Sequence, residues 1–418
     1  MEISLPYGKS HINAVLPDEF TVEYIAPRSQ AAAQDPAATV MQAVYNPLGD
    51  VSPPRAGMRV AIAINDKTRP VPHESLLPPV LAGLRRAGIR DLDVHVIIAT
   101  GTHPVITPDE YGTILPRPIL DTYRVSCHDA YNEHNLTALG ETSRGTPIAI
   151  NSDYMKADYR IVIGNIEPHQ FQGFSGGVKS AAIGLAGVET INRNHAMMRQ
   201  PQAIWGSYAD NPARQDVEEI GARIGIDFCV NAILNAEKGL ARALAGEPVA
   251  VMRAGIPSVR ELYAVPVSAP VALMIASPGG HPKDINLYQA QKGMAHASVA
   301  TRSGGRMILC AACPEGAGNA DYERWMRQPQ IDSHAAVLAE FAREGFRVGR
   351  HKAFQVSRDA SRVQTALVTD MADELARALL LAKAASLQAA VDEALATLAL
   401  GARIGVMPAA NATMPVVL

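Results

Sequence analysis

The sequence predicts an α/β fold of two domains, each with a mainly parallel sheet flanked by helices. Short apolar runs rich in valine and isoleucine alternate with helical patterns, which is the order typical of parallel sheets. The chain of 418 residues is also longer than one ordinary core accommodates. The runs that we expect to form buried strands are 58–65, 93–100, 159–165, 271–278 and 306–312.

Helical patterns lie between these runs. One covers residues 73–88, although Pro78 and Pro79 are expected to interrupt it. Another covers 214–225, and the alanine-rich segment 370–401 predicts one or two helices. Proline recurs between residues 255 and 270, just before a new strand, so we predict two domains that cover residues 1–265 and 266–418.

The composition narrows the class of protein. The chain is 48% hydrophobic and 19% charged, with a formal net charge of −3 and no basic run, which argues against a nucleic-acid partner. It has neither a signal-peptide pattern nor an apolar stretch of about 18 residues, so we expect no membrane span. Cys310 and Cys313 form a lone C-x-x-C pair, which predicts two buried or loop thiols rather than a zinc site. The four cysteines together favour a reduced, cytoplasmic protein.

Polar motifs follow four of the predicted strands directly. They are DKTRP at 66–70, GTHP at 101–104, EPHQFQGFSGG at 167–177 and PGGHPKDINLYQ at 278–289. Ligands of parallel α/β sheets bind outside the carboxyl ends of the strands. The positions of these motifs therefore predict a ligand site.

The segment GFSGGVKS, residues 173–180, resembles a phosphate loop but lacks its pattern, because Val178 separates Gly177 from Lys179. The backbone amides of Gly176 and Gly177 could still bind an anion, or the pair could form a simple tight turn. Small residues flank Lys179. This lysine is either a solvated side chain or a partly buried nucleophile with a lowered pKa.

Three histidines lie near the predicted strand ends, namely His103, His169 and His195. Each alone is more often a structural residue, but together they are candidates for acid–base chemistry or metal binding. Asp66 and Arg69 follow the first strand three residues apart. Arg69 could bind a carboxylate and Asp66 could orient an imidazole, or the two could form a local ion pair.

The segment 283–293 predicts a helix that Asp284 caps and Gly293 ends. Tyr288 and Lys292 are four residues apart and would share one face of it, with Gln289 beside them. These side chains could hold an anionic substrate, or they could form the solvated face of an ordinary amphipathic helix.

Five motifs in order, DKTRP, GTHP, PHQFQGFSGGVKS, NRNH and PGGHPKDINLYQAQK, resemble the lactate racemase family over about residues 1–320. The resemblance implies a racemase or epimerase of a 2-hydroxy acid that is lactate-like, malate-like or a sugar acid. It also implies a nickel-pincer nucleotide as hydride acceptor. A base would take the hydroxyl proton while the hydride leaves Cα, and return of the hydride to the other face would invert the centre.

The same resemblance implies a role for each candidate residue. Lys179 would anchor the cofactor covalently, His195 would bind nickel, and His103 and His169 would be the paired acid–base residues. The implied cofactor contacts are Ser175, Gly176, Gly177 and Asp66, and the implied substrate contacts are Arg69, Tyr288, Gln289 and Lys292. Residues 1–265 would then form the cofactor-binding and catalytic domain, residues 266–418 would contribute substrate contacts, and the active site would lie in the cleft between them.

The implied partners are the small 2-hydroxy acid and the proteins that synthesise the cofactor. Two alternatives stay open on the sequence. One is a nucleotide-dependent phosphotransferase that uses the glycine-rich loop, which the absent Walker pattern disfavours. The other is a non-catalytic carrier of the nickel nucleotide, which would have no need of paired acid–base histidines.

Overall fold

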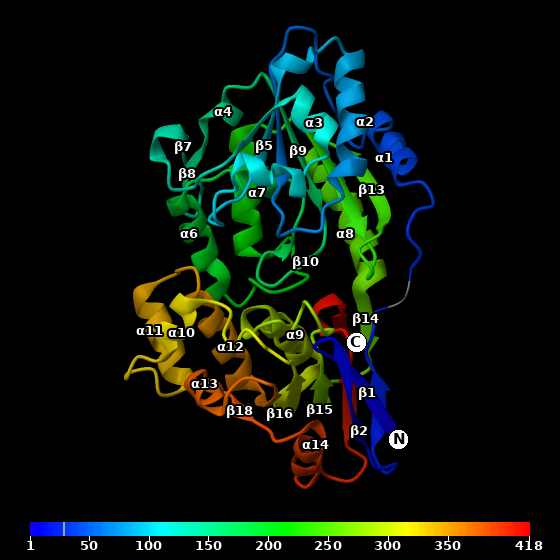
Figure 1. Cartoon of the computed structure of the whole chain (residues 1–418), viewed down its shortest axis with the longest axis vertical. Coiled ribbons are helices and arrows are strands. Elements are labelled where there is room, and N and C mark those ends of the chain that lie inside the picture. Colours follow the sequence, from blue (N-terminus) through cyan, green and yellow to red (C-terminus); the bar gives the residue numbers. More distant parts are fainter. Residues whose placement is uncertain (28–29) are drawn as a thin grey trace. The chain divides into compact units, whose positions relative to one another are not determined.

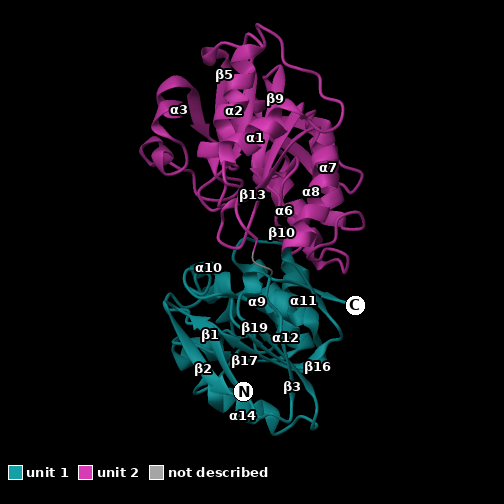
Figure 2. Ribbon diagram, turned by 90° about the vertical axis from the view of Figure 1, so that its right-hand side faces the viewer, with its two compact units in different colours: residues 1–28, 263–418 teal, residues 29–262 magenta. Residues whose placement is uncertain are grey.

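The computed structural model describes residues 1–27 and 30–418. The chain forms two compact units, one of residues Ser29–Leu262 and the other of Met1–Arg28 with Tyr263–Leu418 (Figures 1 and 2). Each unit contains a six-stranded sheet with helices around it, as the sequence predicts. None of the helices in the described part of the chain has the length and apolarity needed to cross a bilayer.

The sheet of the unit Ser29–Leu262 has the order β13-β12-β9-β4-β5-β6. Neighbouring strands are parallel except for β12 and β13, which are antiparallel. The bounds are β4 Val60–Asn65, β5 Val94–Ala99, β6 Arg124–Cys127, β9 Tyr159–Asn165, β12 Phe228–Leu234 and β13 Leu240–Gly246. Two small antiparallel pairs accompany it, β7 Leu136–Glu141 with β8 Pro147–Asn151, and β10 Pro168–His169 with β11 Gly173–Phe174.

The helices of this unit are α1 Pro36–Tyr45, α2 His73–Arg86, α3 Arg117–Thr122, α4 Ser152–Met155, α5 Lys179–Ala182, α6 Val188–Ala196, α7 Pro212–Ile224 and α8 Pro248–Tyr263. Helix α2 runs through Pro78 and Pro79 without a break, contrary to the predicted interruption. Its leucines Leu76, Leu77 and Leu84 are buried against the sheet. Each buried side chain contributes roughly 1.5–3 kcal/mol, which offsets the cost of an interior proline, about 3 kcal/mol.

The second unit has the parallel sheet β18-β17-β16-β15-β19-β3. Its strands are β3 Thr21–Tyr24, β15 Val271–Ala276, β16 Thr301–Cys310, β17 Gln364–Val368, β18 Ala382–Lys383 and β19 Arg403–Met407. Two further pairs are β1 Glu2–Tyr7 with β2 Ser10–Val15, and β14 Ala264–Val267 with β20 Met414–Val417. Its helices are α9 Leu287–Ala300, α10 Ala320–Met326, α11 His334–Glu344, α12 Arg350–Arg362, α13 Asp373–Ala378 and α14 Leu387–Leu395.

The five predicted strands are all present as β4, β5, β9, β15 and β16. The division of the chain differs at its start, since β3 pairs with β19 and residues before it pack in the C-terminal unit, whereas the predicted first domain began at residue 1. Strand β3 has only four residues, and a strand so short carries no signal of which sheet it joins. The alanine-rich segment 370–401 forms the short helices α13 and α14 with strand β18 between them.

Helix α9 begins and ends elsewhere than predicted. Its N-cap is Asn286, whose side chain accepts from the backbone amide of Gln289 at 3.1 Å, and it continues past Gly293 to Ala300. A Cβ at Gly293 would lie 3.0 Å from Asn411 Oδ1 and 3.2 Å from the Cα of Pro278, so this glycine serves close packing rather than termination.

The lone C-x-x-C pair contains two free, buried thiols. Burial raises the pKa of Cys313 to about 12 and raises that of Cys310 as well. Thiols with raised pKa values are poor nucleophiles and poor metal ligands, so the pair is structural, as the sequence favoured.

Gly221 tests how helix α7 packs against the start of α5. A Cβ at Gly221 would lie 2.5 Å from the Cβ of Val178, the residue before Lys179. Alanine favours a helix by about 1 kcal/mol over glycine, but overpacking costs about 1–3 kcal/mol. We expect Gly221→Ala to lower the denaturant midpoint of unfolding. The control Gly112→Ala places its Cβ in open space and should leave the midpoint unchanged. Equal midpoints for both variants would contradict this packing.

Candidate active site

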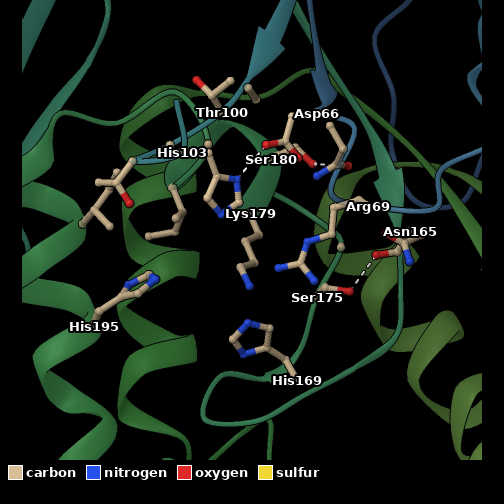
Figure 3. A pocket seen from close by; sticks show the side chains of 18 residues that line it. Asp66, Arg69, Thr100, His103, Asn165, His169, Ser175, Lys179, Ser180 and His195 are labelled. Atoms are coloured by element: carbon tan, nitrogen blue, oxygen red, sulfur yellow. Dashed lines mark hydrogen bonds and ion pairs between the residues drawn. The ribbon is translucent and has the colours of Figure 1, made fainter. Parts of the chain in front are cut away.

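The pocket of interest lies in the unit Ser29–Leu262, at the carboxyl ends of β4, β5 and β9 (Figure 3). Their last residues, Asn65, Ala99 and Asn165, all line it. The predicted site residues that line this pocket are Asp66, Arg69, His103, His169, Ser175, Gly176, Lys179 and His195. The fold thus brings together side chains that are far apart in the sequence: Asp66 and His195 are separated by 129 positions.

Four predicted site residues do not line this pocket. One is Gly177, whose backbone amide donates to Asn231 Oδ1 at 2.7 Å, and this hydrogen bond holds the loop in place. Tyr288, Gln289 and Lys292 lie on α9 of the other unit. There Lys292 Nζ donates to Gln289 Oε1 at 2.8 Å.

Asp66 and His103 form a short hydrogen bond. Asp66 Oδ2 accepts from His103 Nδ1 at 2.6 Å, while Thr68 donates to Asp66 Oδ1 through its backbone amide at 3.1 Å and its hydroxyl at 2.6 Å. Burial alone would raise the pKa of Asp66. The hydrogen bond and charge of His103, together with the two hydrogen bonds from Thr68, outweigh burial and lower the pKa overall. Because the carboxylate can only accept, His103 carries its proton on Nδ1, and the neutral ring keeps its lone pair on Nε2.

His169 is held in the opposite tautomer. The backbone amide of Gln172 donates to His169 Nδ1 at 3.2 Å, so the neutral ring carries its proton on Nε2. The buried ring of Phe171 lies edge-on between His169 and His195, with centroid distances of 4.9 and 5.0 Å. The two hydrogen bonds therefore favour opposite tautomers, with Nδ1–H in His103 and Nε2–H in His169.

Lys179 begins helix α5 and points into the pocket (Figure 3). Desolvation by burial lowers its pKa well below the usual value, and the positive charges of Arg69 and Arg214 lower it further, against an opposing effect of Glu167. Arg69 itself pairs with Glu167 at 3.2 Å. A buried lysine with a lowered pKa loses its proton more readily than a solvated one, which favours the nucleophilic reading over the solvated one.

His195 lies in the last turn of α6, and its ring points into the pocket (Figure 3). Burial, followed by the charges of Lys179 and His103, lowers its pKa to about 3. The ring is therefore neutral at physiological pH, which is the form that binds a metal ion. Among residues 1–27 and 30–418, no group of three or more His, Cys, Asp or Glu side chains is arranged to hold a metal.

Arg214 does not line the pocket but supports the loop that does, and the sequence did not indicate it. Its buried guanidinium on α7 donates to the backbone carbonyls of Phe174 at 3.0 Å and Gly176 at 3.1 Å. It also pairs with Glu218 at 2.6 Å. The spacing of Arg214 and Glu218 is that of an exposed i,i+4 helix pair, so the sequence signal pointed to a solvated face.

A second group that the sequence missed lies on α12, beside Tyr288. Lys352 Nζ is 4.8 Å from the centre of the Tyr288 ring, and the His351 ring lies edge-on at 5.9 Å. Burial raises the pKa of Tyr288, so its hydroxyl stays protonated and can donate a hydrogen bond. No sequence motif marks residues 351 and 352, because their proximity to Tyr288 arises from helix packing.

The fold and the pocket define a two-unit α/β protein whose pocket brings together three histidines, an arginine and a buried lysine of lowered pKa. Family models match most of the chain: the lactate racemase N-terminal domain over residues 7–206 and the lactate racemase C-terminal domain over residues 267–414. The chain belongs to the lactate racemase family and is an isomerase of the racemase and epimerase type.

Individual relatives agree with this membership. Lactate racemase of Thermoanaerobacterium thermosaccharolyticum is 32% identical over 337 residues, 78% of each chain. Lactate racemase of Lactiplantibacillus plantarum is 31% identical over 325 residues, 76% of each chain.

Two solved structures resemble the fold. The lactate racemase apoprotein of T. thermosaccharolyticum has a TM-score of 0.90 at 27% identity and matches all of both chains. A protein of Thermotoga maritima has a TM-score of 0.66 at 17% identity, over 92% of this chain and 97% of its own, and shares the fold.

The buried amine of Lys179 should weaken the fold of the apoprotein. Its pKa is lower in the folded chain than in the unfolded one, so the unfolded state binds an extra proton between those two pKa values. Stability therefore rises with pH across that window, and it is depressed near pH 7. We expect Lys179→Met to raise the melting temperature at pH 7 and to lose this advantage as the pH approaches about 10.5. Differential scanning fluorimetry across pH measures it, with the exposed Lys156→Met as control. An advantage that does not change with pH would contradict a lowered pKa.

Proposed function

We propose that this protein racemises or epimerises a 2-hydroxy acid, with a nickel-pincer nucleotide held at Lys179 and His195. The observation that carries the proposal is the meeting, in one pocket, of two histidines in opposite tautomers with a low-pKa lysine and a neutral histidine. Two histidines suit proton transfer at the hydroxyl of both enantiomers, since the hydroxyl of each enantiomer lies on a different side of Cα.

The side chains of the pocket fit the cofactor that the family implies. The lowered pKa of Lys179 favours the neutral amine that covalent attachment to a thiocarboxylate group needs, and neutral His195 suits a nickel ligand. His195 supplies one protein nitrogen, so the cofactor itself would supply further donors. When bound, the cofactor would accept a hydride from Cα of the substrate and return it.

Ser175 and Gly176 would lie against the nucleotide, and Gly177 would support the loop behind them. Gly176 has φ +80°, and a Cβ there would lie 2.6 Å from Ile166 Cγ1 and 2.7 Å from Asn231 Oδ1. A side chain is thus excluded, and the loop backbone itself faces the pocket.

The histidines divide the proton transfers. His103 Nε2 would take the hydroxyl proton from one enantiomer, and the Asp66 carboxylate would stabilise the imidazolium that forms. His169 would act in its protonated form, with Nδ1–H in place of the hydrogen bond from Gln172, and would give the Nε2 proton to the keto oxygen when the opposite enantiomer forms. The roles would reverse in the other direction, and proton exchange with solvent would restore the two rings.

The substrate carboxylate would bind Arg69, whose guanidinium is oriented by Glu167. Tyr288, Gln289 and Lys292 are proposed as further substrate contacts. Lactate-like, malate-like and sugar acids all carry the carboxylate and the 2-hydroxyl that these residues would recognise. Single enantiomers of each, tested in turn, distinguish among them.

Nickel content and racemisation test the function together. We expect protein produced in cells that also make the cofactor to contain near-stoichiometric nickel by elemental mass spectrometry and to racemise a 2-hydroxy acid without added NAD. His195→Ala should lose both. Nickel without turnover on any hydroxy acid would indicate a carrier, and magnesium-dependent ATP binding without nickel would indicate a phosphotransferase.

The acid–base assignment has its own test. His103→Gln and His169→Gln should each lower the racemisation rate by about 10²–10⁴-fold while the nickel content stays at the wild-type level. The exposed His134→Gln provides the matched control and should keep full activity. Full activity in either of the first two variants would refute that residue's role in proton transfer.

A further inference from the structure

We propose that Asp216 is a positioning residue that sets which nitrogen of His195 carries the proton, acting through Asn194. Neither residue has a role in the functions considered so far, and neither lines the pocket. The inference rests on the proposed function in one respect, namely that His195 is the metal ligand.

The chain of hydrogen bonds begins at Thr142. Its Oγ1 accepts from the backbone amides of Arg144 at 3.3 Å and Thr146 at 3.1 Å. Both lone pairs of the hydroxyl are therefore used, and its hydrogen points to Asp216 Oδ1 at 2.6 Å. The direction of this first bond is fixed by backbone groups that cannot reverse.

Asp216 in turn orients the side-chain amide of Asn194. Asp216 Oδ2 accepts from Asn194 Nδ2 at 2.9 Å, and the same amide nitrogen donates to the carbonyl of Ala213 at 2.9 Å. Asp216 and Asn194 are both fully buried. With its nitrogen engaged by two acceptors, the amide of Asn194 has one orientation, with Oδ1 on the side of His195.

The orientation of the Asn194 amide sets the tautomer of His195. Asn194 Oδ1 lies 3.2 Å from His195 Nδ1 and accepts from Gln172 Nε2 at 2.8 Å. Because Oδ1 can only accept, His195 Nδ1 carries the proton, which leaves the lone pair on Nε2. A second residue that fixes the tautomer of a metal-binding histidine is a general feature of metal sites.

A carboxylate is required at residue 216 because donors face both of its oxygens. An amide there would turn its NH₂ group towards either Thr142 or Asn194. Since the Thr142 hydroxyl is fixed, the clash of two donors falls on Asn194. Rotation of its amide removes this clash at the cost of the hydrogen bond to the Ala213 carbonyl. Gln172 accommodates that rotation, because its Oε1 is buried and accepts no hydrogen bond. Asn194 would then present Nδ2 to His195, and the proton of the ring would move to Nε2.

The direct test is the tautomer of His195 in the apoprotein. Long-range ¹H–¹⁵N correlation spectra of ¹⁵N-histidine-labelled protein at pH 7 distinguish Nδ1–H from Nε2–H, and His195→Gln assigns the signal. We expect Nδ1–H in the wild type and Nε2–H in Asp216→Asn. Glu189→Gln, at an exposed carboxylate on α6, the helix of Asn194, is the matched control and should keep Nδ1–H. A folded Asp216→Asn protein with the wild-type tautomer would overturn the proposal.

A second variant covers the case in which Asp216→Asn does not fold. Asn194→Ala removes the acceptor at His195 Nδ1, so we expect a mixture of the two tautomers. An unchanged, pure Nδ1–H signal in this variant would equally refute the relay.

Nickel retention tests whether the tautomer of His195 affects metal binding, separately from the tautomer itself. In protein produced with the cofactor, we expect Asp216→Asn to bind nickel about 10–100-fold more weakly than the wild type. Wild-type nickel affinity in a variant with the reversed tautomer would overturn the metal-positioning role. If the wild type itself holds no nickel, the proposed function fails, whereas the tautomer measurement still decides the relay.

Discussion

The pocket depends on the hydrogen bonds that buried Arg214 donates to the backbone of the glycine-rich loop. Strand pairing in the loop is limited to β11, Gly173–Phe174, with β10, and the following Gly176 and Gly177 adopt positive φ angles outside any strand. The guanidinium instead binds the carbonyls of Phe174 and Gly176, and the loop then delivers Lys179 to the start of α5. The same positive charge contributes to the low pKa of Lys179, so one side chain both shapes the loop and tunes the amine at its end.

Burial in the pocket favours the uncharged forms of two basic groups. It lowers the pKa values of Lys179 and His195, which favours the lone pairs that the proposed attachment and metal binding require. His103 and His169 differ in the hydrogen-bond partner of Nδ1, which is a carboxylate for His103 and a backbone amide for His169. Such burial of ionisable groups is common in active sites and lowers the stability of the fold, because a buried lysine with a lowered pKa favours the unfolded, protonated chain.

Much of the fold and part of the site could be predicted from sequence, for identifiable reasons. Apolar runs mark β4, β5 and β9, and polar residues just after them must meet at one edge of a parallel sheet, which is why Asp66, His103 and Lys179 could be found. Short or distant elements carry no such local signal: β3 joins the C-terminal sheet, and His351 meets Tyr288 only through helix packing. Arg214 and Asp216 resemble the polar face of a surface helix, and only the folded chain buries them.

The attachment of the cofactor at Lys179 is the claim that a single measurement tests most directly. Protein co-produced with the cofactor pathway can be digested and its peptides sequenced by tandem mass spectrometry. We expect the peptide that contains Lys179 to carry the mass of the nucleotide, on that lysine and on no other. Bound nickel nucleotide with an unmodified Lys179 peptide, or with the added mass on another lysine, would contradict the role that the low pKa and position of Lys179 support.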